Sequence, residues 1–430
     1  MIKIEMPLYK EQMFCYNTAR TNVLVGCCQV ERTILHCDCN SFFASVEGVL
    51  NPELKKYAYA VCGDPEYRHG IILAKNEAAK KYGVKTGEAI WQAKSKCPKL
   101  VTVKPHYEMY KKYSEIIFNI YCRYTDLVEP FGIDECWLDV SGTTHLFGSG
   151  EEIADELRRV VKAETGLTIS VGVSYNKIFA KMGSDYKKPD ATTVITQSNF
   201  KDLLYPLPVG DMFMVGRRSA ERLRSLGFFK IGDIATADEV TLKRIFGENG
   251  RVLWQNVNGF NYSPVMPFDY REAYKSIGNG ATFKRDLVNP KDVRTCVFFL
   301  CDKVAARLRK HNVECSALQI GIKDTHMQSI SRSVQLPSPT DLSFDLRRSA
   351  LSLIQDNIDV TKEPIRSLTV TGTKLLNGDE VCEQISLLDL EYHIKREKEQ
   401  RLENAKDNIR HKYGLGTLTR CSFIHNEFGF

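Results

Sequence analysis

The chain has 430 residues, of which 43% are hydrophobic, and a formal net charge of +6, so roughly two to four domains with sizeable cores are possible. No signal peptide or membrane-spanning apolar run is evident and the 14 cysteines lack zinc-ribbon spacing, so we expect a cytoplasmic protein with reduced core thiols. Residues 271–310 hold ten Lys and Arg against four Asp and Glu, a surplus equal to the net charge, which indicates a polyanionic partner such as nucleic acid unless this surface is merely solvated.

The first two hundred residues alternate strands with helices, and we assign residues 1–31 no function. Strands are predicted at 33–39, 70–74, 128–140 (two strands around a tight turn), 167–174 and 192–196. Helices are predicted at 41–50, with Ser41 or Asn40 as N-cap, after the strand at 70–74 through Lys80, and at 107–123, 151–164 and 175–187. With residues 50–105 set aside as an insertion, the order βα, ββ, αβ predicts a split βαβ, ferredoxin-like α+β arrangement.

The pattern changes after Tyr205. Residues 211–260 are helical in pattern, and residues 270–376 return to α+β. Four strands are predicted there, at 275–282, 316–323, 329–335 and 367–375. The last fifty residues are polar and charged, with a helix expected at 391–412.

Three carboxylates fall where the predicted strands meet. Asp38 ends the first strand, and Asp134 and Glu135 lie in the hairpin that should pair with it. Three acids at one sheet edge would repel one another unless divalent cations lie among them, and two Mg²⁺ ions with oxygen ligands suit phosphoryl transfer. Strict alternation would point the adjacent acids to opposite faces, so we expect a bulge or strong twist there. The alternative is a surface turn with ordinary acids.

Three segments resemble the palm motifs of the Y-family DNA polymerases, the translesion enzymes of the DNA polymerase IV type. They read "ILHCDCNSFFASVE" from residue 34, "VEPFGIDECWLDV" from residue 128 and "SVGVSYNKIFAKMGSDYKKPDA" from residue 170, and the likeness continues to about residue 376. The resemblance implies a template-directed, low-fidelity polymerase without proofreading. It would add deoxynucleotides to a primer 3′ end by two-metal phosphoryl transfer, in damage tolerance and DNA repair.

The resemblance also implies a domain order. The implied parts are a leader (1–31), a palm (32–49 and 105–204), inserted fingers (50–104), a helical thumb with a helix-hairpin-helix (205–268), a basic α+β little finger (270–376) and a tail (377–430). We expect a monomer that works on nucleoid DNA.

Site residues follow from the motifs by position. Asp38, Asp134 and Glu135 would be the catalytic ligands of two Mg²⁺ ions, and the backbone carbonyl of Cys39 would add a ligand. Lys188, before a proline, falls where the family holds the triphosphate of the incoming deoxynucleotide.

Two aromatic residues open the predicted helix after Asp38. Phe43 falls at the family's steric gate against ribonucleotides, while Phe42 beside it points about 100° away on a helix and can enter the core. A second core aromatic is the alternative for Phe43. We interpret Lys181, in the third motif, as a solvated or DNA-facing residue.

The chain departs from the family pattern at three positions. Asn40 replaces the usual Asp, and Glu77 and Lys80 replace the Tyr and Arg of the fingers that contact phosphates. Lys80 keeps the positive charge as a substrate-binding residue but loses the bidentate fork of Arg.

DNA and clamp contacts are expected further along the chain. "MVGRRSAERLRSLG" resembles half of a helix-hairpin-helix, in which Gly216 would let the backbone approach a phosphate and Arg217 follows; a helical turn with a tight glycine is the alternative. Lys284 and Arg285 belong to the basic segment. Residues 384–388, "QISLL", resemble a sliding-clamp-binding peptide, for which the expected contacts are Gln384, Leu387 and Leu388; a plain amphipathic strand is the alternative.

Two other functions compete with the polymerase. A template-free nucleotidyl transferase or cyclase can share a palm-like fold, but the helix-hairpin-helix and the basic segment argue against it. A catalytically dead DNA-binding scaffold is opposed by the three intact acids.

Overall fold

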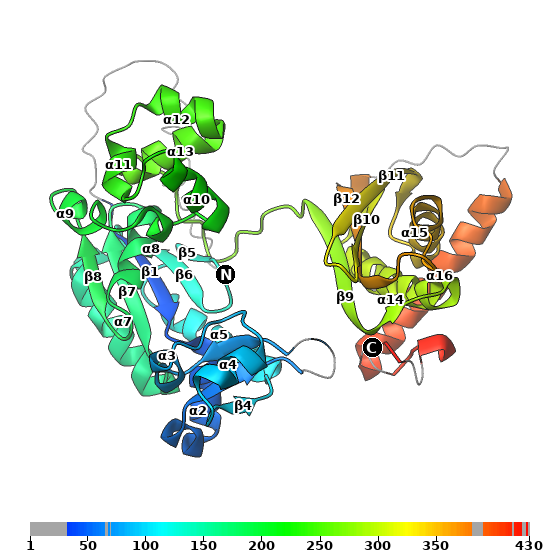
Figure 1. The fold of residues 1–430 in the computed structure, drawn as a ribbon, viewed down its shortest axis with the longest axis horizontal. Coiled ribbons are helices and arrows are strands. Elements are labelled where there is room, and N and C mark those ends of the chain that lie inside the picture. The colour runs from blue at the N-terminus through cyan, green and yellow to red at the C-terminus, as the bar shows by residue number, and fades with distance from the viewer. Residues whose placement is uncertain are drawn as a thin grey trace, which may run out of the picture. The chain divides into compact units, whose positions relative to one another are not determined.

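The computed structural model describes residues 32–64, 68, 70–380, 390–414, 417–423 and 427–428. The chain divides into two compact units, whose elements can be followed by residue number in the colours of Figure 1. Of the described residues, one unit joins 32–40 with Lys112–Phe268, and the other joins Ser41–Lys111 with those from Asp269 onward. Among the described helices, none has the length and apolarity that a membrane span requires.

The first unit is built on a five-stranded sheet in the order β5-β6-β1-β7-β8. The strands are β1 Ile34–Cys39, β5 Val128–Pro130, β6 Glu135–Asp139, β7 Ile169–Ser174 and β8 Thr192–Ile195. β1 lies antiparallel between β6 and β7, and β8 runs parallel to β7. The first four strands have the ferredoxin-like order that the sequence predicts, and α8 and β8 extend it at one edge.

Helices α7 (Gly150–Thr165) and α8 (Lys177–Tyr186) cover opposite faces of this sheet, because they contact adjacent residues of β7, whose side chains alternate between faces. A Cβ on Gly150 of α7 would meet the side chains of Leu35 and Val173. Gly172, the residue before Val173 in β7, faces α8, where a Cβ would lie 1.9 Å from the carbonyl oxygen of Ala180. The glycine therefore lets α8 approach the sheet closely and sets the depth at which its side chains reach the strand ends.

The rest of the first unit is helical. The C-terminal part of α5 (Tyr107–Tyr121) belongs to it. The other helices, in chain order, are α6 (Thr144–Phe147), α9 (Phe200–Leu204), η3 (Val209–Asp211), α10 (Arg217–Ser225), α11 (Ile231–Ala235), α12 (Glu239–Phe246) and α13 (Glu248–Val257). The last four pack around buried apolar residues that include Leu223, Ile234 and Leu242, continuous with Phe179 of α8. The predicted helical stretch from residue 211 is confirmed.

In the second unit, residues 41–111 form a three-stranded sheet with short helices. The elements are α2 (Phe42–Leu50), η1 (Pro52–Lys56), β2 (Tyr59–Cys62), β3 (Ile72–Lys75), α3 (Glu77–Lys81), α4 (Ile90–Lys96) and β4 (Val101–Val103), and the strand order is β3-β2-β4. The sequence predicts β3 and the helix after it but misses β2, β4 and α4. Ser41 occupies the predicted N-cap position in a left-handed conformation (φ 51°) and makes no capping bond; its hydroxyl donates to Glu77 instead.

Residues 269–430 carry a four-stranded antiparallel sheet in the order β11-β10-β12-β9. The elements are β9 (Ser276–Leu287), α14 (Pro290–Lys310), β10 (Val313–Asp324), β11 (Ser329–Thr340), α15 (Ser343–Asn357), β12 (Ile365–Asn377), η4 (Gly378–Glu380), α16 (Leu390–Tyr413) and η6 (Cys421–Phe423). The four predicted strands are confirmed, each somewhat longer than its pattern. α16 is tied to α14, because Arg309 pairs with Glu403 at 3.0 Å and with Asp407 at 2.6 Å.

Candidate active site

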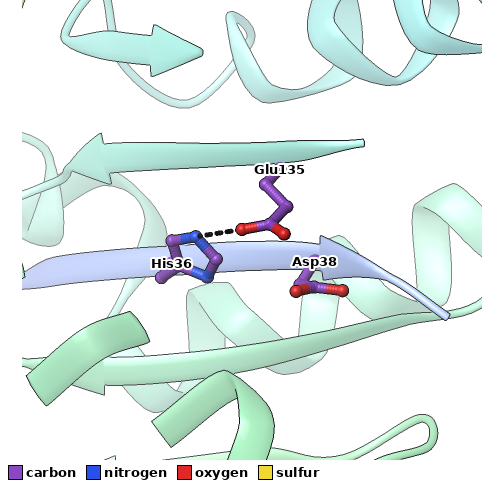
Figure 2. A group of neighbouring side chains, drawn as sticks. All are labelled: His36, Asp38 and Glu135. Atoms are coloured by element: carbon purple, nitrogen blue, oxygen red, sulfur yellow. Dashed lines mark ion pairs between the residues drawn. The ribbon is translucent and has the colours of Figure 1, made fainter. Parts of the chain in front are cut away.

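The register of the first sheet brings two of the predicted acids together. Asp38 on β1 lies opposite Glu135 on β6, and His36 lies opposite Trp137. Alternate residues of a strand share a face, so His36, Asp38 and Glu135 all lie on the side covered by α8. Each offers one ligand atom, and these atoms lie within 4.8 Å of one another (Figure 2). The convergence that the strand pattern predicts for Asp38 and Glu135 is therefore present in the structure.

Lys181 of α8 lies between these two carboxylates. Its Nζ is 2.8 Å from Asp38 Oδ2 and 2.9 Å from Glu135 Oε2, and only 7% of the residue is exposed. The interpretation of Lys181 as a solvated or DNA-facing residue is therefore wrong. Because a buried carboxylate needs a compensating charge, the ammonium stabilises two acids that would otherwise repel each other. A sequence signal existed, since Lys181 lies inside a helical run whose neighbours are mostly apolar.

Lys188 reaches the same acid from the end of the third motif. Its Nζ lies 2.7 Å from Asp38 Oδ2 and 2.7 Å from Asp185 Oδ1. Burial opposes the charged form, but Asp38 and Asp185 outweigh burial and raise the pKa of Lys188. The side chain is 30% exposed, so it can leave Asp38 for a ligand in solvent without rebuilding the core.

Asp134 lies in the turn just before β6 rather than in the strand. Its carbonyl oxygen accepts a hydrogen bond from the backbone N–H of Cys39 at 3.0 Å. The pairing of β1 with β6 runs without a register shift from Ile34 to Asp38, so the expectation of a bulge is wrong, while that of a strong twist stays a prediction. A bulge is not needed, because alternation between faces does not constrain a turn residue. The two adjacent acids are separated by the end of a strand.

The pKa values of these two adjacent acids are shifted in opposite directions. Burial, then the charges of Asp38 and Glu135, raise the pKa of Asp134 to about 6. Burial also opposes ionisation of Glu135, but the close approach of His36 at 3.3 Å and of Lys181 at 2.9 Å outweighs it and lowers its pKa to about 2. Glu135 is therefore held ionised by fixed partners, whereas at Asp134 burial and two like charges outweigh the charge of Lys188.

His36 is a site residue that the sequence reasoning missed. It is fully buried, its Nε2 lies 3.3 Å from Glu135 Oε2, and its Nδ1 lies 2.8 Å from the hydroxyl of Ser184 on α8. Burial lowers the pKa of the imidazole. The signal was available, because a residue two positions before Asp38 in a strand must share its face.

Asn40, which departs from the family pattern, fits its surroundings as an amide. Its Nδ2 donates to Thr168 Oγ1 at 3.1 Å, and its Oδ1 accepts from Ser170 Oγ at 2.8 Å. A carboxylate could not donate to the threonine. The substitution therefore keeps a further negative charge out of the buried end of β1.

The predicted substrate-binding residues Phe42, Phe43 and Lys80 belong to the second unit. Phe42 is 3% exposed, as the helical spacing predicts, while Phe43 is half-buried. Lys80 Nζ pairs with Glu77 Oε1 at 2.5 Å, so the acid that replaces the family's tyrosine partly neutralises the lysine that replaces its arginine.

The predicted DNA contacts lie on three elements. Gly216 precedes α10 with open space around it, and the side chain of Arg217 is 87% exposed. Lys284 is exposed on β9, and Arg285 pairs with Asp292 at 2.6 Å and with Glu427 at 2.8 Å, so it would have to exchange these partners for a phosphate. The expected clamp-binding residues Gln384, Leu387 and Leu388 lie outside the described residues.

Comparisons with known proteins give one consistent relationship. A profile described as "impB/mucB/samB family" matches residues 37–185, and its C-terminal domain profile matches residues 274–387. The DNA polymerase IV of Acetivibrio thermocellus is 46% identical over 398 residues, covering 93% of this chain and 99% of that protein. DNA polymerase IV 1 of Bacillus subtilis is 36% identical over 396 residues, covering 92% of this chain and 94% of that protein.

A solved structure shares the fold. A Y-family DNA polymerase chimera superposes with a TM-score of 0.71 at 24% identity, covering 80% of this chain and 99% of that one.

Proposed function

The chain belongs to the impB/mucB/samB family, that of the Y-family DNA polymerases, and from that premise we propose how its own residues carry out DNA synthesis. It is a DNA polymerase of the translesion type, similar to DNA polymerase IV along nearly its whole length. Its reaction is nucleotidyl transfer to the 3′ end of a primer paired with a template. The observation that carries the site assignment is the convergence of Asp38 and Glu135 around Lys181.

Divalent metal is implied by the family, and the donor set fits it. Two carboxylate oxygens already converge on a cation, the ammonium of Lys181, with Asp134 close enough to feel both charges. We assign the metal as Mg²⁺, since hard oxygen donors are what it prefers, held by Asp38, Asp134, Glu135 and the carbonyl of Cys39. Two ions held there would supply positive charge to the triphosphate and to the primer oxygen.

Side chains of this chain balance the charge of the acids around the metal site. Glu135 stays ionised through Lys181 and His36, which orient it from the α8 side. Lys188, only half-buried on Asp38, would exchange that carboxylate for the triphosphate of the incoming nucleotide. Each lysine therefore compensates the acids before substrate arrives and remains available as a positive charge afterwards.

Sugar selection is assigned to Phe43. Only four residues separate it from Asp38 in the chain, so its Cα lies within about 18 Å of that of the acid whatever the backbone does. A ring against the 2′ carbon would leave no space for a hydroxyl and would offer it no hydrogen-bond partner.

The remaining partners are proposed from the chain's other features. Gly216, Arg217, Lys284 and Arg285 would hold primer–template DNA by its backbone, and residues 384–388 would bind a replication sliding clamp. We propose a monomeric enzyme without proofreading that works in damage tolerance on nucleoid DNA in the cytoplasm.

Primer extension with a templating control tests the proposal. Asp38→Asn or Glu135→Gln should abolish extension, while Glu151→Gln, at an exposed position of α7, should not. Incorporation that follows the template base distinguishes this enzyme from a template-free transferase. Wild-type extension by either acid variant would refute the site.

A further inference from the structure

Helix α2 carries a buried carboxylate four residues after Phe43. Glu47 is 3% exposed, and its Oε1 accepts a hydrogen bond from the hydroxyl of Tyr110. Nδ1 of His106 lies 2.9 Å and 3.0 Å from the two carboxylate oxygens. Positions four apart lie on the same side of a helix, so this network lies directly behind Phe43.

Tyr110 joins the carboxylate to the ring of Phe43. The two rings are stacked with centroids 4.2 Å apart and planes 11° apart, and Tyr107 meets Phe43 edge-on with centroids 6.1 Å apart. Tyr110 is fully buried, so its ring cannot move aside without opening the core. Burial and the bond to Glu47 raise the pKa of its hydroxyl, which keeps it a donor.

We propose that Tyr110 and Glu47 are positioning residues for sugar selection: Glu47 fixes the plane of Tyr110, and Tyr110 prevents the ring of Phe43 from retreating. The inference rests on the proposed role of Phe43 as the gate. A gate must be rigid as well as large, because a ring that tilts or withdraws by an ångström admits the 2′ hydroxyl of a ribonucleoside triphosphate. One face of Phe43 is covered by Tyr110, and the half-buried remainder is the part available to a nucleotide.

A purely structural role predicts something different. Removing an ordinary core contact would lower stability and reduce synthesis equally for both sugars. A positioning role changes the ratio of the two, chiefly by lowering KM or raising kcat for ribonucleotides. The ratio of kcat/KM for a deoxynucleotide to that for its ribonucleotide is therefore the decisive measurement.

The test uses single-nucleotide insertion by the full-length chain, with a melting curve for each variant. Tyr110→Leu should lower the ratio about two- to tenfold, the range expected for loss of one stacked aromatic pair. Tyr110→Phe, which keeps the stack and loses the hydroxyl, should give a smaller loss. Glu47→Gln can still accept from Tyr110 and should retain the wild-type ratio, whereas Glu47→Leu should lower it. Tyr82→Leu, at a 58% exposed tyrosine of the same unit, is the matched control and should change nothing.

Phe43→Ala tests the gate itself, separately from the positioning role of Tyr110 and Glu47. If Phe43→Ala loses selectivity and a folded Tyr110→Leu keeps it, the positioning role is overturned and the gate stands. If Phe43→Ala itself keeps selectivity, the gate falls, and the positioning role falls with it. Should Tyr110→Leu fail to fold, an unchanged ratio in both Tyr110→Phe and a folded Glu47→Leu would overturn the proposal.

Discussion

Asp134→Asn and Glu135→Gln form a matched pair of variants at adjacent residues, and we expect them to change stability in opposite directions. Both remove one negative charge and keep the shape of the side chain. Asp134 is buried near like charges, and its pKa is raised to about 6 from a usual 3.8, whereas the pKa of Glu135 is lowered to about 2 by His36 and Lys181 despite burial. Asn at 134 therefore removes a repulsion, and Gln at 135 removes an attraction.

The expected changes in the free energy of unfolding follow from the pKa shifts. About two pKa units at Asp134 correspond to at most about 3 kcal/mol, so we expect metal-free Asp134→Asn to gain about 1–3 kcal/mol at neutral pH, or roughly 2–10 °C in melting temperature. Glu135→Gln should lose a comparable amount. A raised carboxyl pKa stabilises the folded state only below the unfolded pKa, so the advantage of Asp134→Asn should vanish near pH 4 and be complete above about pH 6. The lowered pKa of Glu135 works the other way, so its contribution is present above about pH 4.5 and fades as the pH falls toward 2.

The assay is a melting curve in EDTA and in Mg²⁺ across pH 4.5–8, with primer extension as the second measurement. Mg²⁺ should raise the melting temperature of the wild type and do so much less in either variant, and neither variant should extend a primer. If Asp134→Asn melts below the wild type in EDTA at neutral pH, or if its difference from the wild type is the same at pH 4.5 and 7.5, the electrostatic assignment is refuted.

Further predictions concern the partners of the site and the chain. Lys181→Met should destabilise the metal-free protein, because it leaves Asp38 and Glu135 facing each other, and Mg²⁺ should restore much of the loss in a thermal melt. Replacing Lys275, Lys284 and Lys291 with Ser should weaken DNA binding and reduce the slope of log affinity against log salt by up to about 0.9 for each phosphate that is no longer neutralised; an unchanged slope would mean a merely solvated surface. Changing Gln384, Leu387 and Leu388 to Ala should remove clamp-stimulated synthesis without affecting clamp-free synthesis, and stimulation that survives would contradict the clamp assignment.

Local patterns were sufficient for most elements and for the acids. The alternation of residues 33–39 predicts β1, and the spacing of Phe42 and Phe43 predicts which ring is buried, because both depend only on the geometry of one element. The short strands β2 and β4 were missed, since three or four residues carry too little periodicity to be told from a loop.

The meeting of Asp38 and Glu135 could be predicted from the chain alone, because paired strands in a split βαβ fold leave few alternatives for their ends. The environment of these acids could not, since it depends on packing between distant segments. Lys181 comes from a helix nearly 150 residues from Asp38 in the chain, and its depth depends on the close approach that Gly172 allows. The difference between Asp134 and Glu135 likewise depends on the residue at which β6 begins. The pKa values of two adjacent carboxyl groups shift in opposite directions because of partners that no local pattern specifies.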